Sequence, residues 1–377
     1  MRQAGTGGTE RYLNQVAKLA CERGHEVTIV CRSHEEPPHP DCRFEVLRPF
    51  SIGGAMRMKN FARAVEAHVK SASYDLVFGL GKTYTHDLIR LGGGCHATYL
   101  ELAHRDTLEP WEKVVGKGKL KHRLALQIED RALAPGAYRR VITNSEMVKR
   151  DVIERHAVPE DAVDVVYNGV DCERFDLSLR ENLGSKLRGS LGIGPGERVV
   201  LFLGTGYGRK GLAPLMEAFA RLAKSDASLT LMVVGYDSAQ SSFERRAAEL
   251  GLAGRVHFLG GRRDTETCYA AANLYVLPTR YDPFANTTLE ALASGLPVIT
   301  TRTNGGHELL SEGVDGSVLD APDADEIERA LRFWTDGNRC QAARAATRSL
   351  AERHPARRVA EESLAVCERV VAELALE

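Results

Sequence analysis

Two acidic residues, Asp282 and Glu290, are separated by seven residues in a segment that predicts a phosphate site. The segment runs from Tyr281 to Thr301 and indicates a helix that ends at Gly295-Leu296-Pro297, followed by an apolar strand. A helix N-terminus binds phosphate through backbone N–H groups, and a carboxylate in its first turn can accept hydroxyl hydrogen bonds. These are the groups that a nucleotide sugar requires. Thr287–Glu290 also fits a capping box, in which Glu290 would only satisfy a backbone donor.

A second group of candidates lies in Gly204–Gly211, after the apolar run Leu201-Phe202-Leu203. Its Gly206-x-Gly208-x-x-Gly211 pattern is a weak dinucleotide fingerprint, because no acidic residue follows the next strand at the expected spacing. It is not a Walker A loop, since a glycine follows Lys210. The adjacent cations Arg209 and Lys210 suit a diphosphate whose charge grows as a bond breaks. Two solvated charges in a turn remain the alternative.

Apolar strands separated by amphipathic segments must position these loops. Such alternation predicts parallel sheets covered on both faces. Because the chain contains two such series of strands and helices, we expect an α/β fold of two doubly wound domains. Ligands bind outside the carboxyl ends of strands in such sheets, so loops 204–211, 259–264 and 278–288 are expected to converge. The predicted strands are Glu26–Cys31, Asp75–Gly79, Arg140–Thr143, Val163–Tyr167, Arg198–Leu203, Thr230–Val234, Val256–Leu259, Leu274–Leu277 and Val298–Thr301.

Composition agrees with two domains of ordinary size. The chain has 377 residues, 43% of them hydrophobic and 27% charged, and a net charge of −1, which gives no general attraction to nucleic acid. No apolar run is long enough to cross a bilayer, and the N-terminus does not resemble a signal peptide. Eight scattered cysteines without a Cys-x-x-Cys pair indicate reduced thiols in a cytoplasm. Asp323-Ala324-Asp325 is read as a helix cap, so no metal site is predicted.

The predicted domains are 1–170, 171–355 and a C-terminal helix, 356–377, that returns to the first domain. A doubly wound domain should begin with a buried strand, yet residues 1–8 contain none, and a helix is predicted from Thr9 to Arg23. A truncated or misassigned start is favoured over a missing strand, because loss of a central strand exposes two unpaired edges.

Taken together, these motifs resemble the retaining glycosyltransferases of family 4, which have the GT-B fold. The resemblance runs from Gly7-Gly8-Thr9-Glu10-Arg11 to the C-terminus and includes Val166–Asp171, Gly208–Gly211 and the acidic pair. Within the family, Gly208–Gly211 and Val256–Arg262 are most similar to lipopolysaccharide core heptose glucosyltransferases.

The resemblance implies roles at the matching positions. Arg209 and Lys210 would hold the donor diphosphate, Glu290 would accept the ribose hydroxyls, and Asp282 would lie at the donor sugar. The family usually has Glu at the position of Asp282, whose side chain is one methylene shorter. His96, after Gly92-Gly93-Gly94, is a candidate for contact with a sugar. The remaining implied binding residues are Gly7, Gly8, Gly208, Gly261, Arg262 and the backbone N–H groups of Asn286, Thr287 and Thr288.

The implied reaction is transfer of a hexose, with glucose from UDP-glucose as first choice, to a glycan acceptor such as the lipopolysaccharide core. The nucleotide sugar is a substrate, and no separate cofactor or metal ion is implied. The basic segment Trp111–Leu126 is read as a contact with an anionic membrane surface, with a solvated helix face as alternative. Two other functions stay open: a GT-B nucleotide-sugar 2-epimerase, and a degenerate protein that binds nucleotide sugar without turnover.

Overall fold

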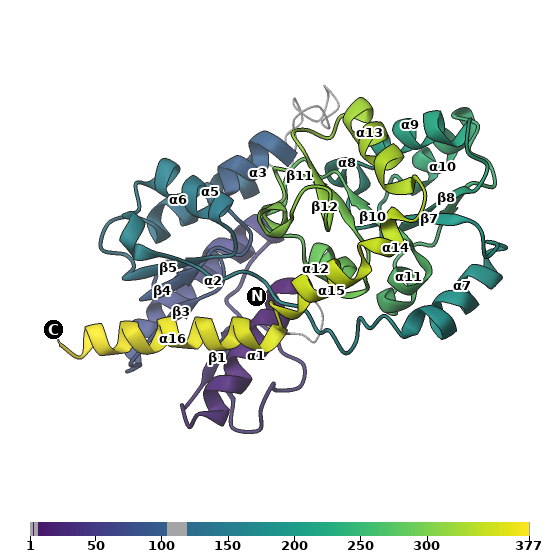
Figure 1. Cartoon of the computed structure of the whole chain (residues 1–377). Helices are drawn as coiled ribbons and strands as arrows, with labels where there is room; N and C mark the ends of the chain where they lie inside the picture. The colour runs from purple at the N-terminus through teal and green to yellow at the C-terminus, as the bar shows by residue number, and fades with distance from the viewer. Residues whose placement is uncertain (1–2, 4–6, 104–118, 377) are drawn as a thin grey trace. The chain divides into compact units, whose positions relative to one another are not determined.

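The computed structural model describes residues 3, 7–103 and 119–376, and it divides the chain into two compact units. The first comprises Met1–Asn168 and Ala356–Glu377, and the second comprises Gly169–Pro355. The units therefore change within two residues of the boundaries expected at 170/171 and 355/356. Each unit contains parallel strands and helices, which confirms the predicted α/β class (Figure 1).

The second unit contains a six-stranded parallel sheet in the order β12-β11-β10-β7-β8-β9. From β7, the chain adds β8 and β9 on one side and then β10, β11 and β12 on the other. The order thus reverses between β7 and β10, the switch point at which open α/β sheets bind ligands. The strands are β7 (Arg198–Leu203), β8 (Leu229–Val234), β9 (Val256–Phe258), β10 (Leu274–Leu277), β11 (Val298–Thr301) and β12 (Gly316–Leu319).

Helices cover both faces of this sheet, so its central strands are buried almost completely. Every residue of β8 and β10 is buried, as expected for near-continuous apolar strands in a parallel sheet. The helices of the unit are η2 (Arg180–Gly184), α7 (Ser185–Ser190), α8 (Tyr207–Lys210), α9 (Leu212–Ala223), α10 (Gln240–Glu249), α11 (Thr265–Ala271), α12 (Asn286–Ala293), η3 (Gly305–Leu309), α13 (Ala324–Thr335), α14 (Arg339–Ala342) and α15 (Arg344–Glu352).

The first unit has two separate parallel sheets, β1-β2 and β3-β4-β5-β6. In the part of this unit that the structure describes, no strand joins β1 to β3, which agrees with the predicted lack of a first strand. The amide of Gln3 donates to the Ser33 carbonyl (2.9 Å), beyond the end of β1. The strands are β1 (Thr28–Cys31), β2 (Arg43–Val46), β3 (Phe78–Gly79), β4 (Leu88–Arg90), β5 (Arg140–Thr143) and β6 (Val163–Val165).

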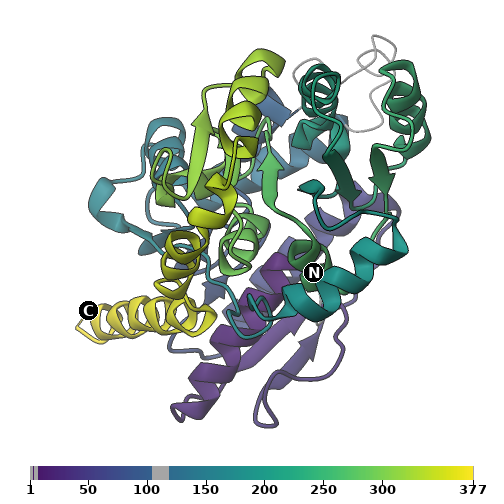
Figure 2. The ribbon, with the colours of Figure 1, turned by 45° about the vertical axis from the view of Figure 1, so that its right-hand side comes forward.

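The C-terminal helix packs against the first helix of the chain within this unit (Figures 1 and 2). The Tyr12 hydroxyl lies 2.8 Å from Ser363 Oγ, and Arg23 pairs with Glu368 at 3.3 Å. No described helix is long and apolar enough to cross a membrane. The helices of the unit are α1 (Gly8–Glu22), α2 (Gly53–Ser71), α3 (His96–Ala103), α5 (Lys119–Ala132), α6 (Glu146–His156), η1 (Glu160–Ala162) and α16 (Ala356–Leu374).

Three strands were not predicted from the sequence: β2, β4 and β12. The outer strand β2 exposes Arg43 and Glu45, and β4 has only three residues, so neither forms a long apolar run. β12 begins with Gly316, where an added Cβ would lie 2.4 Å from the Val298 carbonyl oxygen. Close backbone approach to β11 requires glycine there, although glycine is unfavourable in an isolated strand.

Candidate functional site

The loop after β7 lies at the switch point and contacts the loop after β10. The amide of Arg280 donates to the Arg209 carbonyl at 2.8 Å, and Arg209 Nη1 donates to the Tyr281 carbonyl at 2.8 Å. Arg209 and Lys210 close the short helix α8, whose first amide, that of Tyr207, donates to Asp237 at 2.6 Å. Two of the three loops expected to converge therefore contact one another.

Gly211 permits this close contact. Its φ is +81°, and an added Cβ would lie 1.9 Å from the Pro278 carbonyl oxygen. Gly211→Ala is therefore expected to lower the free energy of unfolding by about 2 kcal/mol or more, from backbone strain and this clash. Gly196→Ala is the matched control, because nothing lies within 4 Å of its added Cβ. Equal urea midpoints for the two variants would contradict the role assigned to Gly211.

Asp282 joins the two predicted diphosphate cations. Its Oδ2 accepts a hydrogen bond from Lys210 Nζ and lies 3.7 Å from Arg209 Nη1. Lys210 is 7% exposed, and burial lowers its pKa, an effect that Asp282 opposes. The carboxylate predicted to lie at the donor sugar is thus paired with the cations predicted to hold the diphosphate. A bound diphosphate would have to share or replace Asp282 on Lys210.

Asp282→Asn is consequently expected to tighten the binding of UDP. The substitution removes a negative charge that competes with the diphosphate and repels it, so we expect affinity to rise about fivefold, roughly 1 kcal/mol. Calorimetric titration of UDP measures the change. Asp320→Asn, which removes an exposed ion pair with Arg302 in the same unit, is the control. Unchanged or weaker UDP binding in Asp282→Asn would show that the ion pair does not compete with the nucleotide.

Glu290 does not cap its helix, so the capping-box alternative is wrong. Helix α12 begins at Asn286 with Ala285 as N-cap, and no side chain caps it. Glu290 therefore lies beyond the first turn and is only 7% exposed. Its Oε2 accepts a hydrogen bond from the Tyr269 hydroxyl at 3.0 Å, and burial together with this carboxylate raises the pKa of Tyr269 well above its usual value. The carboxylate therefore lies on the face of α12 that is directed toward the interior of the unit.

The start of α12 is organised by Asn304, a residue to which the sequence analysis gave no role. This fully buried side chain accepts from the amides of Ala285 (3.0 Å) and Gly306 (3.2 Å) and donates to Thr288 Oγ1 (3.1 Å). The Thr288 amide donates to the Ala285 carbonyl at 2.9 Å, so it is already used, contrary to its predicted role in the phosphate site. The signal in the sequence that could have revealed this role is an Asn directly before Gly-Gly, after a predicted strand.

The predicted base-binding residues lie after β9. Arg262 Nη2 pairs with Asp264 at 2.5 Å, and this partner raises the pKa of Arg262, while Arg262 Nε is buried without a hydrogen-bond partner. An added Cβ on Gly261 would meet only Tyr236, whose side chain is 68% exposed. The Gly235 amide donates to the Gly260 carbonyl at 2.8 Å, so this loop contacts the segment after β8.

In the first unit, Gly7 and Gly8 lie at the start of α1, as predicted. Gly7 is the N-cap, with φ +107°, and its carbonyl accepts from the Arg11 amide at 3.0 Å. An added Cβ on Gly7 would lie 2.2 Å from Glu10 Oε2. Both glycines are exposed, so their backbone is accessible in this unit.

His96 begins α3 and contacts other side chains of the first unit. Its Nε2 lies 3.0 Å from His122 Nδ1, and its amide donates to Glu129 Oε1 at 2.7 Å. Burial, together with Lys82, lowers the pKa of His96 to about 4, so the ring is neutral near pH 7. A neutral imidazole can accept or donate a hydrogen bond to a sugar hydroxyl, but it is not a cation for the diphosphate.

Glu129 anchors the loop that carries His96. It is 2% exposed and pairs with Lys82 at 2.6 Å, and it lies with Cys95 and His156 in a group whose potential ligand atoms are all within 4.8 Å of one another. The sequence analysis missed this group because its members are far apart along the chain. The other acidic motif is a helix cap, as predicted: Asp323 accepts from the amides of Asp325 and Glu326.

The basic segment 111–126 is only partly described, since residues 111–118 lie outside the described residues. Within α5, Lys121 and Arg123 are exposed, whereas Leu124 and Ala125 are buried in the first unit. The described part therefore presents a basic surface, and two of its apolar residues belong to the core.

The fold and the site together define the class of protein. The chain has two doubly wound units, and adjacent cations and a buried carboxylate lie at the switch point of the second. This is the arrangement of a GT-B nucleotide-sugar enzyme. The family model described as glycosyl transferases group 1 matches residues 185–350, and that described as glycosyltransferase family 4 matches residues 6–174. The chain belongs to the family 4 glycosyltransferases with the GT-B fold.

Individual relatives agree with this family. The chain is 27% identical to lipopolysaccharide glucosyltransferase WaaG of Escherichia coli over 338 residues, which cover 86% of this chain and 85% of WaaG. It is 34% identical to the lipopolysaccharide core biosynthesis glycosyltransferase LpsE of Rhizobium meliloti over 133 residues, 35% of this chain and 38% of LpsE. Apart from WaaG, the chain spans about half or less of the length of the curated relatives that it matches.

Solved structures show the same fold. The crystal structure of WaaG has a TM-score of 0.79 at 23% identity and covers 96% of each chain. Anabaena Alr3699/HepE, solved in complex with UDP, has a TM-score of 0.71 at 20% identity and covers 98% of each chain. Since the relatives are glycosyltransferases, the comparisons do not favour the epimerase alternative.

Proposed function

We propose that the protein transfers a hexose, specifically glucose from UDP-glucose, to a lipopolysaccharide-core or related glycan acceptor, with retention of the anomeric configuration. The observation that carries this proposal is the group formed by Arg209, Lys210 and Asp282 at the switch point of the second unit. Support also comes from the similarity to WaaG, named a lipopolysaccharide glucosyltransferase, and from a structural neighbour that was solved with UDP.

The reaction needs a leaving group that is stabilised as it departs. When the bond between the sugar C1 and the phosphate oxygen breaks, negative charge accumulates on UDP, and Arg209 and Lys210 would stabilise it without a metal ion. The acceptor oxygen forms the new bond to C1 on the same face, and its proton passes to the leaving phosphate. Because Lys210 is buried, its charge is little screened by water and acts strongly on the diphosphate.

Glu290 would fix the nucleotide end of the donor. Its carboxylate is buried and oriented by the Tyr269 hydroxyl, and a carboxylate held in this way can accept hydrogen bonds from ribose hydroxyls. His96 would contact a sugar from the first unit as a neutral ring. We further propose that the enzyme acts on its acceptor at the cytoplasmic face of a membrane, with the basic surface of α5 near anionic lipid.

Calorimetric titration with UDP, UDP-glucose, UDP-galactose and UDP-GlcNAc tests the donor. Micromolar binding of UDP, with tighter binding of UDP-glucose than of the other two sugars, is expected. Release of UDP from UDP-glucose only when lipopolysaccharide core lacking its glucose is added would identify the acceptor class. Absence of binding to all four ligands would overturn the UDP-dependent proposal. Binding without turnover, with every core acceptor tried, would favour a protein that binds nucleotide sugar without catalysis.

A further inference from the structure

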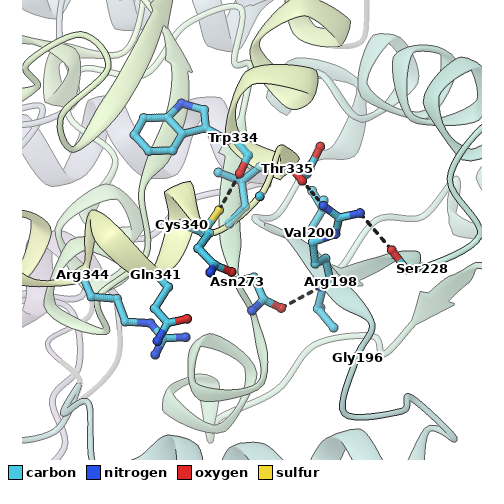
Figure 3. A pocket seen from close by; sticks show the side chains of 14 residues that line it. Gly196, Arg198, Val200, Ser228, Asn273, Trp334, Thr335, Cys340, Gln341 and Arg344 are labelled. Carbon is cyan, nitrogen blue, oxygen red and sulfur yellow. Dashed lines mark hydrogen bonds between the residues drawn. The ribbon is translucent and has the colours of Figure 1, made fainter.

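The second unit has a cavity at the amino-terminal ends of its strands, opposite to the site described above, which lies at their carboxyl ends. The cavity has a volume of about 310 Å³ and is lined by residues at the amino-terminal ends of three strands: Arg198 of β7, Ser228 before β8, and Asn273 before β10 (Figure 3). Residues around α14 complete the lining. Because β7 has six residues at about 3.3 Å each, the cavity lies roughly 20 Å from the loop that carries Arg209 and Lys210. One small ligand cannot occupy both places.

The lining contains hydrogen-bond donors that the protein does not use. In the part of the chain that the structure describes, no hydrogen bond or ion pair is made by the side chains of Asn338, Gln341 or Arg344. All three lie within seven residues around the short helix α14, and Figure 3 shows Gln341 and Arg344 close together. Arg344 is half-buried, so its charge is only partly solvated, whereas Asn338 and Gln341 are exposed at the mouth of the cavity. Two amides and a guanidinium that converge on one cavity are suited to an oxyanion.

Positive charge accumulates around this cavity without enough carboxylates to balance it. Arg180 donates to the Ala272 carbonyl at 2.6 Å and has no carboxylate partner among the described residues. Burial lowers the pKa of Arg180 to about 10, and repulsion from Arg344 and Arg188 contributes. Arg198 has a carboxylate partner, Asp226, and also donates to Ser228 Oγ at 3.0 Å.

The thiol of Cys340, which lines the cavity, is influenced electrostatically by the same cations. Burial raises its pKa to about 12, although Arg198, Arg344 and Arg180 all oppose the rise. Three guanidinium groups therefore act on one point of the lining, and two of them lack a carboxylate partner in the described chain. A cation that is partly removed from water and lacks a counter-charge costs free energy, and a bound anion would lower that cost.

We propose that this cavity is a second anion site that binds the phosphate group of a small phosphate monoester, with Arg344, Gln341 and Asn338 as the recognising side chains. A guanidinium offers two parallel donors to a phosphate, and the amides supply further donors. The volume is at the lower end of the range for small-molecule pockets, so it suits a phosphate with a short organic group and not a nucleotide sugar. This proposal does not depend on the function proposed above.

Glycerol 3-phosphate is the probe, titrated calorimetrically into the full chain with UDP present in saturating amount. We expect one binding event, weakened at least tenfold in Arg344→Gln, which removes the charge and keeps a polar side chain of similar length. Arg329→Gln is the matched control, because Arg329 is exposed on α13 and makes no described interaction. It should bind the probe within twofold of the unchanged protein.

The variant Arg209→Ala separates this site from the predicted donor site. Binding of glycerol 3-phosphate should persist in Arg209→Ala while UDP binding weakens. Loss of probe binding in Arg209→Ala, equal binding in Arg344→Gln and the unchanged protein, or no binding at all would each overturn the proposal. Thermal unfolding of Arg344→Gln, expected at an unchanged midpoint, excludes misfolding as the reason for lost binding.

Discussion

Replacement of Lys210 by Met is expected to lower the rate of glucosyl transfer by about 100-fold or more. Lys210 is the more buried of the two cations at the switch point, and loss of one preorganised charge at a developing anion typically costs a factor of 10² to 10³. The rate is measured as UDP released from UDP-glucose in the presence of the core acceptor. A fall in kcat larger than any change in UDP affinity would place the effect in the transition state.

Two further variants show whether the lost cation is the cause. Lys210→Met alone leaves Asp282 with Arg209 as its remaining cation, so the double variant Lys210→Met, Asp282→Asn removes both members of the buried pair. It should be as slow as the single variant, because the diphosphate still lacks its cation. Lys224→Met, an exposed lysine at the end of α9, is the control and should keep full activity. Recovery of activity in the double variant would mean that the charge of Asp282 without Lys210, and not the missing cation, stops the reaction.

Glu290→Gln is expected to weaken UDP binding by about 10- to 100-fold. A hydrogen bond to a charged acceptor contributes roughly 1.5 to 3 kcal/mol, and Gln retains the shape of the side chain while it loses the charge. Titration with 2′-deoxy-UDP makes the test specific. The unchanged protein should prefer UDP over its deoxy analogue, and Glu290→Gln should lose most of that preference.

The partner of Glu290 provides a graded comparison. Tyr269→Phe removes the hydroxyl that donates to the carboxylate at 3.0 Å but keeps the buried ring, so a smaller loss of UDP affinity is expected. Glu312→Gln, at an exposed position, should not change UDP binding. If Glu290→Gln lowers the unfolding midpoint but keeps the preference for UDP over 2′-deoxy-UDP, Glu290 is a structural residue and not a ribose ligand.

Much of the second unit could be predicted from the sequence. The bounds of β7, β10 and β11 agree with the predicted strands, because strands buried on both faces are mostly apolar and stand out as short apolar runs. The loop that carries Arg209 and Lys210 could be placed for the same reason: it directly follows such a strand, and parallel strands direct their carboxyl ends to one edge. Strands at sheet edges, such as β2, lacked this signal.

The sequence by itself determined the fold class, the two units and the residue types at the switch point. Only the tertiary structure decided what those residues contact: Asp282 pairs with Lys210, 72 positions away, and Tyr269 orients Glu290. The unused donors near Arg344 likewise have no sequence pattern. The physical reason is that periodicity and turn residues act over a few neighbouring positions, whereas ion pairs and cavities depend on how distant segments pack.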